Sequence, residues 1–267
     1  IGTETWGSII SPATTCGVTG LRPTFGRVSR HGAMALSWSM DKIGPIGRSV
    51  EDCAIVLDAI RGSDGHDPST TDAPFAWDAS RDVSTLRVGY VANAFAEGHR
   101  DDDEWDQLDA AALDQLRALG VELRAVELPS IDVGPLSVIL NVEAAAAFDT
   151  LTRSGDDDRL VSQSVHSWPN IFRYTRLVPA VEYLQATRLR TVAMRQMGGT
   201  MADLDAYVVP TFVGQNSLLT NLTGHPSICV PNGFRKDGTP TSLEFIGRLN
   251  GEADLLVLAR AYQQATR

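Results

Sequence analysis

Apolar residues recur along the chain at two different spacings, and these predict helices and strands in alternation. A helix is expected over residues 50–61, where one apolar face repeats every three or four positions: Val50, Cys53, Ala54, Leu57 and Ile60. Ser49 precedes this face as a candidate N-cap, with Asp52 three residues further on, and Gly62 follows as a stop signal.

A strand, a helix and a second strand are predicted from residue 86 to residue 128. "LRVGYVA" (86–92) is typical of a buried strand, and "VELRAVEL" (121–128) is typical of another. Between them, the acidic "DDDEW" suits the start of a helix, where the helix dipole favours negative charge, and Gly120 ends it. This order predicts a βαβ unit with parallel strands.

The remaining chain continues the same alternation and predicts an α/β fold in a single domain, residues 1–267. Residues 16–49 are dense in Gly and Pro and predict an ordered loop region with short strands. Residues 155–159 ("GDDDR") are expected to be a solvated loop, and "RKDGTP" (235–240) a tight turn. Further helices are expected at 136–152, 180–197 and 252–266, and further strands at 205–210, 227–231 and 242–247.

Composition indicates which partners the protein is expected to bind and where in the cell it is expected. The 267 residues carry a net charge of −10, which disfavours direct binding to nucleic acid. Apolar runs are too short to span a membrane, and a secretory leader is not indicated. Three widely spaced cysteines predict reduced thiols and a cytoplasmic location, and no Cys/His cluster has the spacing of a metal site.

The opening stretch "GTETWGSIISP" raises two interpretations of Ser8. It is either part of a buried turn or a nucleophile, and spacing alone favours the turn. Gly7 permits a tight bend that would direct the N–H groups of Trp6, Gly7 and Ser8 to one point, as a developing oxyanion requires. There is no G-x-S-x-G elbow, which makes an α/β-hydrolase a poor interpretation.

Histidines and tryptophans offer weaker candidates. The five histidines have no spacing that indicates a catalytic triad, although triad members meet only in the fold: His31, His66, His99, His166 and His225. His66 and His99 are expected in solvent, and His225 in a structural turn. The five tryptophans are expected in the core or at its rim, at positions 6, 38, 77, 105 and 168.

Taken together, the first 60 residues resemble the amidase signature family. A Gly-Ser-Ile serine loop is followed by "CGVTGLRPTFGRVS", then "DKIGP", then the "SVED" helix, in the order of that family. "DAYVVPT" and "NLTGHPSICVPNGF" extend a weaker resemblance into the second half. The resemblance implies a central twisted mixed sheet flanked by helices. Because Ile1 stands inside motif-bearing sequence, we expect the C-terminal portion of a longer protein, with part of the sheet absent.

The resemblance also implies a reaction. It identifies Ser8 as the nucleophile of a Ser-Ser-Lys triad, and the backbone N–H groups of Thr5, Trp6, Gly7 and Ser8 as the oxyanion hole. A small-molecule amide would be hydrolysed to an acid and ammonia or an amine, without a metal or organic cofactor. The resemblance is compatible with a homodimer. The family's lysine base and bridging serine lie upstream, and neither Lys42 nor Lys236 occupies the base position. We therefore expect this chain alone to be inactive.

Two departures from the family pattern leave alternatives open. Trp6 stands where the family usually has glycine, and should narrow the acyl pocket or cover the loop; Ile10 stands where it usually has arginine. Glu4, which commonly pairs with that arginine, then needs Arg22 or Arg27 as a partner, or faces solvent. The alternative functions are the A subunit of a tRNA-dependent amidotransferase, acting as a glutaminase, and a non-catalytic amidase-like scaffold.

Overall fold

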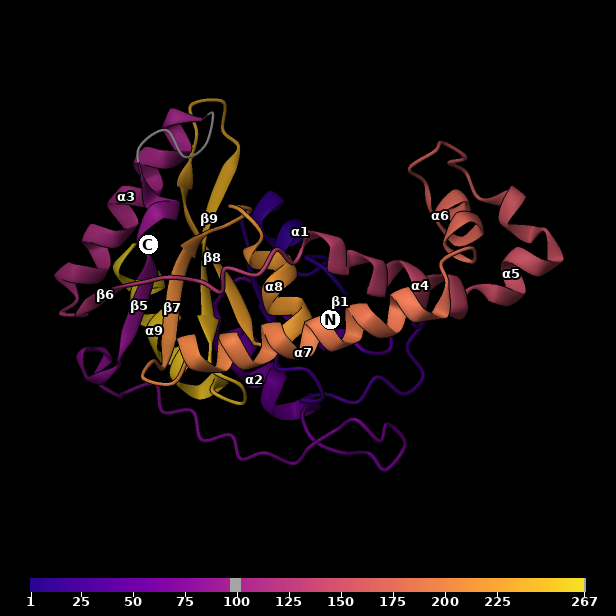
Figure 1. Ribbon diagram of the computed structural model, residues 1–267. Coiled ribbons are helices and arrows are strands. Elements are labelled where there is room, and N and C mark those ends of the chain that lie inside the picture. Colours follow the sequence, from indigo (N-terminus) through magenta and orange to yellow (C-terminus); the bar gives the residue numbers. More distant parts are fainter. Residues whose placement is uncertain (97–101, 267) are drawn as a thin grey trace.

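The computed structural model describes residues 1–96 and 102–266, and a seven-stranded mixed sheet forms its centre (Figure 1). β5 pairs in parallel with β6 and β7, and the remaining neighbours are antiparallel. Across the sheet the order is β4 (Ile46–Gly47), β2 (Thr19–Arg22), β8 (Ser227–Phe234), β9 (Pro240–Gly247), β7 (Ala206–Pro210), β5 (Val88–Val91) and β6 (Leu123–Val126). A separate antiparallel pair joins β1 (Gly2–Glu4) to β3 (Lys42–Gly44).

Helices cover both faces of this sheet. The described helices are α1 (Ile10–Thr15), α2 (Val50–Ile60), α3 (Asp103–Ala118), α4 (Val138–Ala147), α5 (Asp149–Ser154), α6 (Trp168–Thr175), α7 (Ala180–Thr200), α8 (Asn216–Thr223) and α9 (Glu252–Ala265). Alternate side chains of β7 enter two separate cores, as strand geometry requires. Ala206 and Val208 pack with α2, α3 and α9, whereas Tyr207 and Val209 pack with α4, α7 and α8.

Elements specified by local signals are confirmed. Ser49 and Asp52 form a reciprocal capping box at the start of α2, so two backbone N–H groups that would otherwise lack partners are satisfied. The expected βαβ unit is present as β5, α3 and β6, with parallel strands. The turn at 235–240 joins β8 to β9 as a hairpin, and Gly238 adopts φ +83° there.

The region from 136 to 175 differs from the expectation. The helix expected at 136–152 is interrupted at Phe148 and forms α4 and α5, and α6 was not predicted. The solvated loop predicted at 155–159 is wrong, because residues 156–159 form a short 3₁₀ helix, and Asp157 is buried against Arg173 with an Oδ2–Nε distance of 2.6 Å. A carboxylate buried in this way needs its partner, and this ties the segment to α6.

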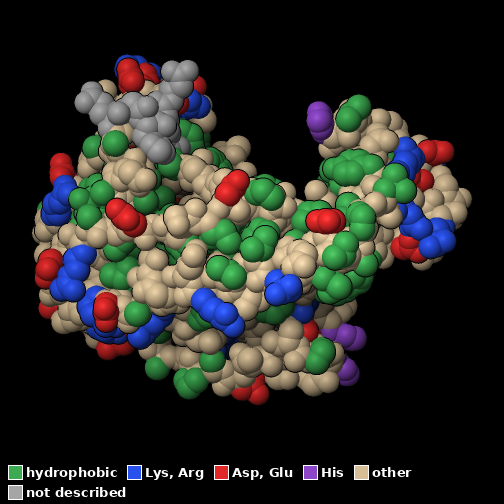
Figure 2. Space-filling view, in the orientation of Figure 1, with side chains coloured by type: hydrophobic (Ala, Val, Ile, Leu, Met, Phe, Trp, Pro, Cys, Tyr) green, Lys and Arg blue, Asp and Glu red, His purple; other side chains and the backbone are tan. Residues whose placement is uncertain are grey.

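Together α4, α5 and α6, residues 138–175, form an arm that extends away from the sheet (Figure 1). Its helices pack mainly on each other, and the rings of Phe148 and Phe172 stack with centroids 4.8 Å apart. Figure 2 shows the arm standing apart from the body, with hydrophobic side chains on its surface. No helix within residues 1–96 and 102–266 is long and apolar enough to cross a membrane.

Candidate active site

The loop that carries Ser8, residues 5–9, lies between β1 and α1 and is called the serine loop below. The chain bends at Gly7, whose φ of +92° lies in the region that favours glycine. Beyond the bend, the N–H of Ser11 donates to the Gly7 carbonyl oxygen at 2.7 Å, and α1 begins. Ser8 is exposed at the bend and its side chain lines a cavity, so the buried turn considered from sequence does not describe it.

Backbone N–H groups of the serine loop divide into two sets. Those of Ile9 and Ile10 donate to Glu4 Oε2, at 2.8 and 3.1 Å. Those of Trp6, Gly7 and Ser8 donate to no other residue in the described part of the chain, and neither does the Ser8 hydroxyl. Unpaired donors beside an exposed hydroxyl are available to a ligand. Thr5 is buried, and its hydroxyl donates to Asp41 Oδ1 at 2.5 Å.

Glu4 fixes the serine loop from inside the protein. Its carboxylate, 1% exposed, accepts a hydrogen bond from Arg22 Nη1 at 2.7 Å and another from Asn221 Nδ2 at 2.9 Å. Burial acts to raise the pKa of Glu4, but the charge and hydrogen bond of Arg22 outweigh it and lower the pKa to about 2. Arg22 is therefore the partner of Glu4, whereas Arg27 lies 3.6 Å from Glu252.

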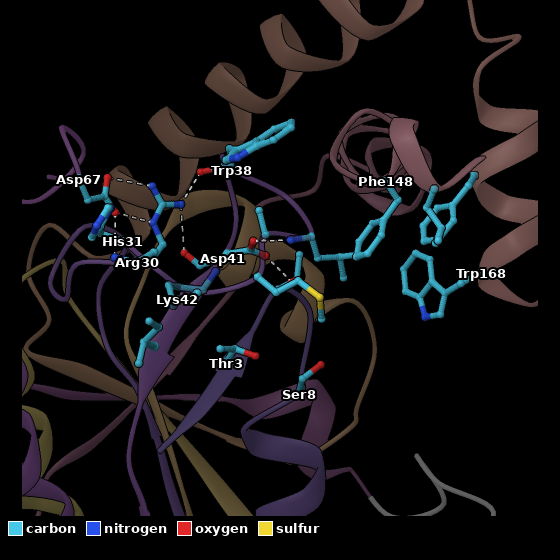
Figure 3. A pocket seen from close by; sticks show the side chains of 18 of the residues that line it. Thr3, Ser8, Arg30, His31, Trp38, Asp41, Lys42, Asp67, Phe148 and Trp168 are labelled. Carbon is cyan, nitrogen blue, oxygen red and sulfur yellow. Dashed lines mark hydrogen bonds and ion pairs between the residues drawn. The ribbon is translucent and has the colours of Figure 1, made fainter. Parts of the chain in front are cut away.

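The cavity beside Ser8 has a volume of about 630 Å³ and two unlike ends (Figure 3). The polar end is formed by β1, β3 and the serine loop, through Thr3, Thr5, Ser8, Asp41 and Lys42. The other end is formed by the arm and is apolar, and its lining residues are Phe148, Leu151, Leu160, Trp168 and Phe172. The remaining lining comes from residues 30–38 and 66–68 and is mixed: Arg30, His31, Ala33, Met34, Ala35, Leu36, Trp38, His66, Asp67 and Pro68.

Lys42 is a site residue whose place the sequence did not reveal. It follows Asp41 in "DKIGP" and pairs with Glu4 across β1 and β3, which brings it into the wall of the Ser8 cavity. The side chain is buried, and its Nζ has no hydrogen-bond partner among the described residues. Burial, reinforced by the charge of Arg22, lowers the pKa of Lys42 well below its usual value. Lowering this pKa favours the neutral form of the amine, which can accept a hydrogen bond.

Histidine positions do not form a triad with Ser8 in the described part of the chain. His31 and His66 stack with ring centroids 4.5 Å apart in the lining of the cavity, without a hydrogen bond to Ser8. His225 is buried, its Nδ1 is 2.8 Å from Thr223 Oγ1, and burial with the charge of Arg22 lowers its pKa to about 4. His166 is exposed on the arm, and His99 lies outside the described residues.

Trp77 packs against the core as expected, whereas Trp6, Trp38 and Trp168 are exposed. Trp38 and Trp168 are exposed by 51% and 41% and line the cavity. Trp6 is exposed by 47% and does not line this cavity, and the expectation that it narrows the acyl pocket or covers the loop stays a prediction. Among residues 1–96 and 102–266 there is no group of three His, Cys, Asp or Glu side chains that could hold a metal ion.

Comparison with known proteins now identifies the family. A family model described as Amidase matches residues 1–256. The chain belongs to the amidase family, as its resemblance to the amidase signature predicted. Its seven-stranded mixed sheet flanked by helices is the fold that its amidase-signature structural neighbours share, and this confirms the predicted fold class.

Similar relatives include both types of enzyme considered from the sequence. The A subunit of the glutamyl-tRNA(Gln) amidotransferase from Nostoc sp. is 33% identical, covering 100% of this chain and 64% of that protein. An amidase from Pseudomonas putida is 34% identical, over 99% of this chain and 62% of that protein. The peptide amidase of Stenotrophomonas maltophilia superposes with a TM-score of 0.81 at 29% identity, over 100% of this chain and 62% of that one. The chain therefore spans a little under two thirds of these relatives.

Proposed function

We propose that the protein is an amidase and that Ser8 is its nucleophile. The observation that carries this proposal is the serine loop, where the exposed Ser8 lines the cavity and the N–H groups of Trp6, Gly7 and Ser8 are left unpaired in the described part of the chain. N–H donors that are already oriented stabilise the negative charge that develops on a carbonyl oxygen during acyl transfer. Membership in the amidase family supports the same assignment.

The proposed reaction has two steps. Ser8 Oγ bonds to the amide carbonyl carbon, the C–N bond breaks, and the nitrogen leaves with the serine proton as ammonia or an amine. Water then attacks the ester, which releases the acid and restores the hydroxyl. The oxyanion of each step would accept hydrogen bonds from the backbone N–H groups of Thr5, Trp6, Gly7 and Ser8.

A proton acceptor is the component that the serine loop does not provide. No histidine, lysine or carboxylate in the described part of the chain is hydrogen-bonded to Ser8 Oγ. The resemblance to the amidase signature assigns this task to a lysine and a bridging serine upstream of the serine loop. We therefore propose that the 267-residue chain alone is inactive and that the full-length protein hydrolyses amides. Steady amide hydrolysis by the chain alone, abolished in Ser8→Ala, would contradict the first part.

The test of the nucleophile is to react full-length protein with a fluorophosphonate and locate the adduct by mass spectrometry. We expect the adduct on Ser8 and, in Ser8→Ala, a fall in amide hydrolysis of roughly 10⁴-fold or more. Ser11→Ala is the matched control, because Ser11 is exposed three residues further on, in α1. An adduct that persists in Ser8→Ala, or equal losses in the two variants, contradicts the proposal.

The A subunit of a tRNA-dependent amidotransferase is the second candidate, favoured by the 33% identity to its counterpart in Nostoc sp.. It uses the same nucleophile to release ammonia from glutamine. Measuring ammonia release from glutamine and from simple amides separates the two, since the amidotransferase interpretation requires glutamine to be the preferred substrate. A non-catalytic scaffold would show neither activity, and Ser8 would remain unlabelled.

A further inference from the structure

Three rings of the arm form an aromatic wall, defined as Phe148, Trp168 and Phe172, in the cavity that Ser8 lines. Phe148 and Phe172 stack with an interplanar angle of 11°, and Trp168 and Phe172 stack with centroids 5.6 Å apart at 27°. Phe172, which stacks with both other rings, is buried, whereas Trp168 is 41% exposed and lines the cavity. Figure 3 shows Phe148 and Trp168 together on the helices of the arm, apart from Thr3 and Ser8.

The guanidinium and the carboxylates of the cavity lining already have partners, and Figure 3 shows them away from this wall. Arg30 and Asp67 form an ion pair at 2.9 Å. Asp41 accepts hydrogen bonds from the hydroxyl of Thr5 and from the backbone N–H groups of Leu36 and Ser37. The other residues of the arm in the lining are Leu151 and Leu160, both apolar. A charged or strongly hydrated substituent would therefore lose its water there without gaining a partner.

We infer that the cavity takes amides that carry an aromatic ring, with the ring packed on the aromatic wall and the amide at Ser8. This inference rests on the proposed function, since it assigns the amide to Ser8. An aromatic ring gains both burial of apolar surface and offset or edge contact with Trp168, which a saturated group of the same size cannot reproduce. A cavity with one apolar end and a few polar groups at the other is the usual form of a small-molecule site.

The experiment measures binding, so it does not depend on turnover. Dissociation constants of 4-phenylbutyramide, 4-cyclohexylbutyramide and butyramide are determined by calorimetry for the unchanged chain, Trp168→Ala and Tyr174→Ala. Tyr174 is the matched control, because it is a 51% exposed aromatic residue of the same helix that does not line the cavity. Equal melting temperatures of the two variants establish that the arm is intact in both.

We expect 4-phenylbutyramide to bind at least tenfold more tightly than butyramide, and more tightly than the cyclohexyl compound, in the unchanged chain and in Tyr174→Ala. In Trp168→Ala this preference should fall by about three- to tenfold. Equal affinities for the phenyl compound and butyramide, an equally good cyclohexyl compound, or an equal loss in Tyr174→Ala would each overturn the inference.

Fluorophosphonate labelling of the full-length protein separates this inference from the proposed function. Labelling at Ser8 without any preference for the phenyl compound refutes the aromatic site and leaves Ser8 as the nucleophile. A preference that depends on Trp168, together with labelling that persists in Ser8→Ala, refutes Ser8 as the nucleophile and, with it, the placement of the amide.

Discussion

The serine loop and the arm contribute opposite ends of one cavity, and they are stabilised in different ways. Glu4, Arg22 and Asn221 hold the serine loop through buried, charge-assisted hydrogen bonds that reach across the sheet. The helices of the arm pack mainly on each other, and the arm exposes apolar side chains such as Val161 and Val165. Its buried tie to the body is Glu143 of α4, which accepts hydrogen bonds from the hydroxyls of Ser37 and Ser39. The difference teaches that the core positions the serine loop, whereas the proposed ring-binding wall lies on helices that pack mainly on each other.

Among the variants that test this comparison, Glu4→Gln should change the free energy of unfolding most. In Glu4→Gln, Arg22 stays buried without its counter-charge, and we expect the free energy of unfolding at pH 7 to fall by about 3–5 kcal/mol. Urea denaturation measures this change. Asp58→Asn is the control, because Asp58 pairs with Arg61 at the surface, and it should change stability far less. Similar losses in both variants would show that the serine loop is not held by the buried pair.

Glu4 also makes the free energy of unfolding depend on pH. The pKa of Glu4 is about 2 in the folded protein and near its usual 4.5 when unfolded, so its contribution is fully present above pH 4.5. That contribution is lost as the pH falls from 4.5 towards 2, because the unfolded state then binds the proton first. The free energy of unfolding of Glu4→Gln, measured by urea denaturation, should therefore depend less on pH between 4.5 and 2 than that of the unchanged chain.

Replacing Lys42 should raise the free energy of unfolding, by less than Glu4→Gln lowers it. Its buried amine makes no hydrogen bond in the described part of the chain, so Lys42→Met removes a desolvated polar group and should stabilise the chain by about 1–3 kcal/mol at pH 7. Folding lowers the pKa of Lys42, so the unfolded state binds more protons and the gain should shrink as the pH rises towards 10.5.

Urea denaturation at pH 7 and pH 9.5 tests this, with Lys236→Met as the control. Lys236 is the other lysine of the chain, and its side chain is 88% exposed, so no measurable gain is expected there. A destabilised Lys42→Met at pH 7 would show instead that the amine contributes to holding β1 against β3.

Of Glu4→Gln, Lys42→Met and Gly7→Ala, the substitution at the Gly7 bend should change the free energy of unfolding least. A Cβ at Gly7 would meet only Ser217 Oγ, at 3.7 Å, so Gly7→Ala is limited by the positive φ and should cost about 1–2 kcal/mol. Gly198→Ala in α7 should instead stabilise the chain by up to about 1 kcal/mol, because that glycine lies within a helix. Thermal denaturation compares the two, and a neutral Gly7→Ala would mean that the bend can relax.

Local signals made the body of the fold predictable, and long-range contacts limited the rest. Ser49 and Asp52 specify the start of α2 within four residues, so the sequence was sufficient there. α6 was missed although Pro169 occupies its first turn, a position that favours proline. Lys42 could not be placed because its position depends on β1 pairing with β3, about forty residues away. The aromatic wall likewise depends on how the arm folds back on itself.

The hydrogen bond of Glu4 to a residue far along the sequence has a consequence for folding during biosynthesis. Its hydrogen bond to Asn221 joins residues 217 positions apart, and β2 pairs with β8 over a similar separation. A ribosome releases the chain from its N-terminus, so the segment around Ser8 emerges long before the residues that hold it. The nascent polypeptide must therefore keep this segment in an unfinished conformation until translation has passed α8, and cellular chaperones would meet it in that interval.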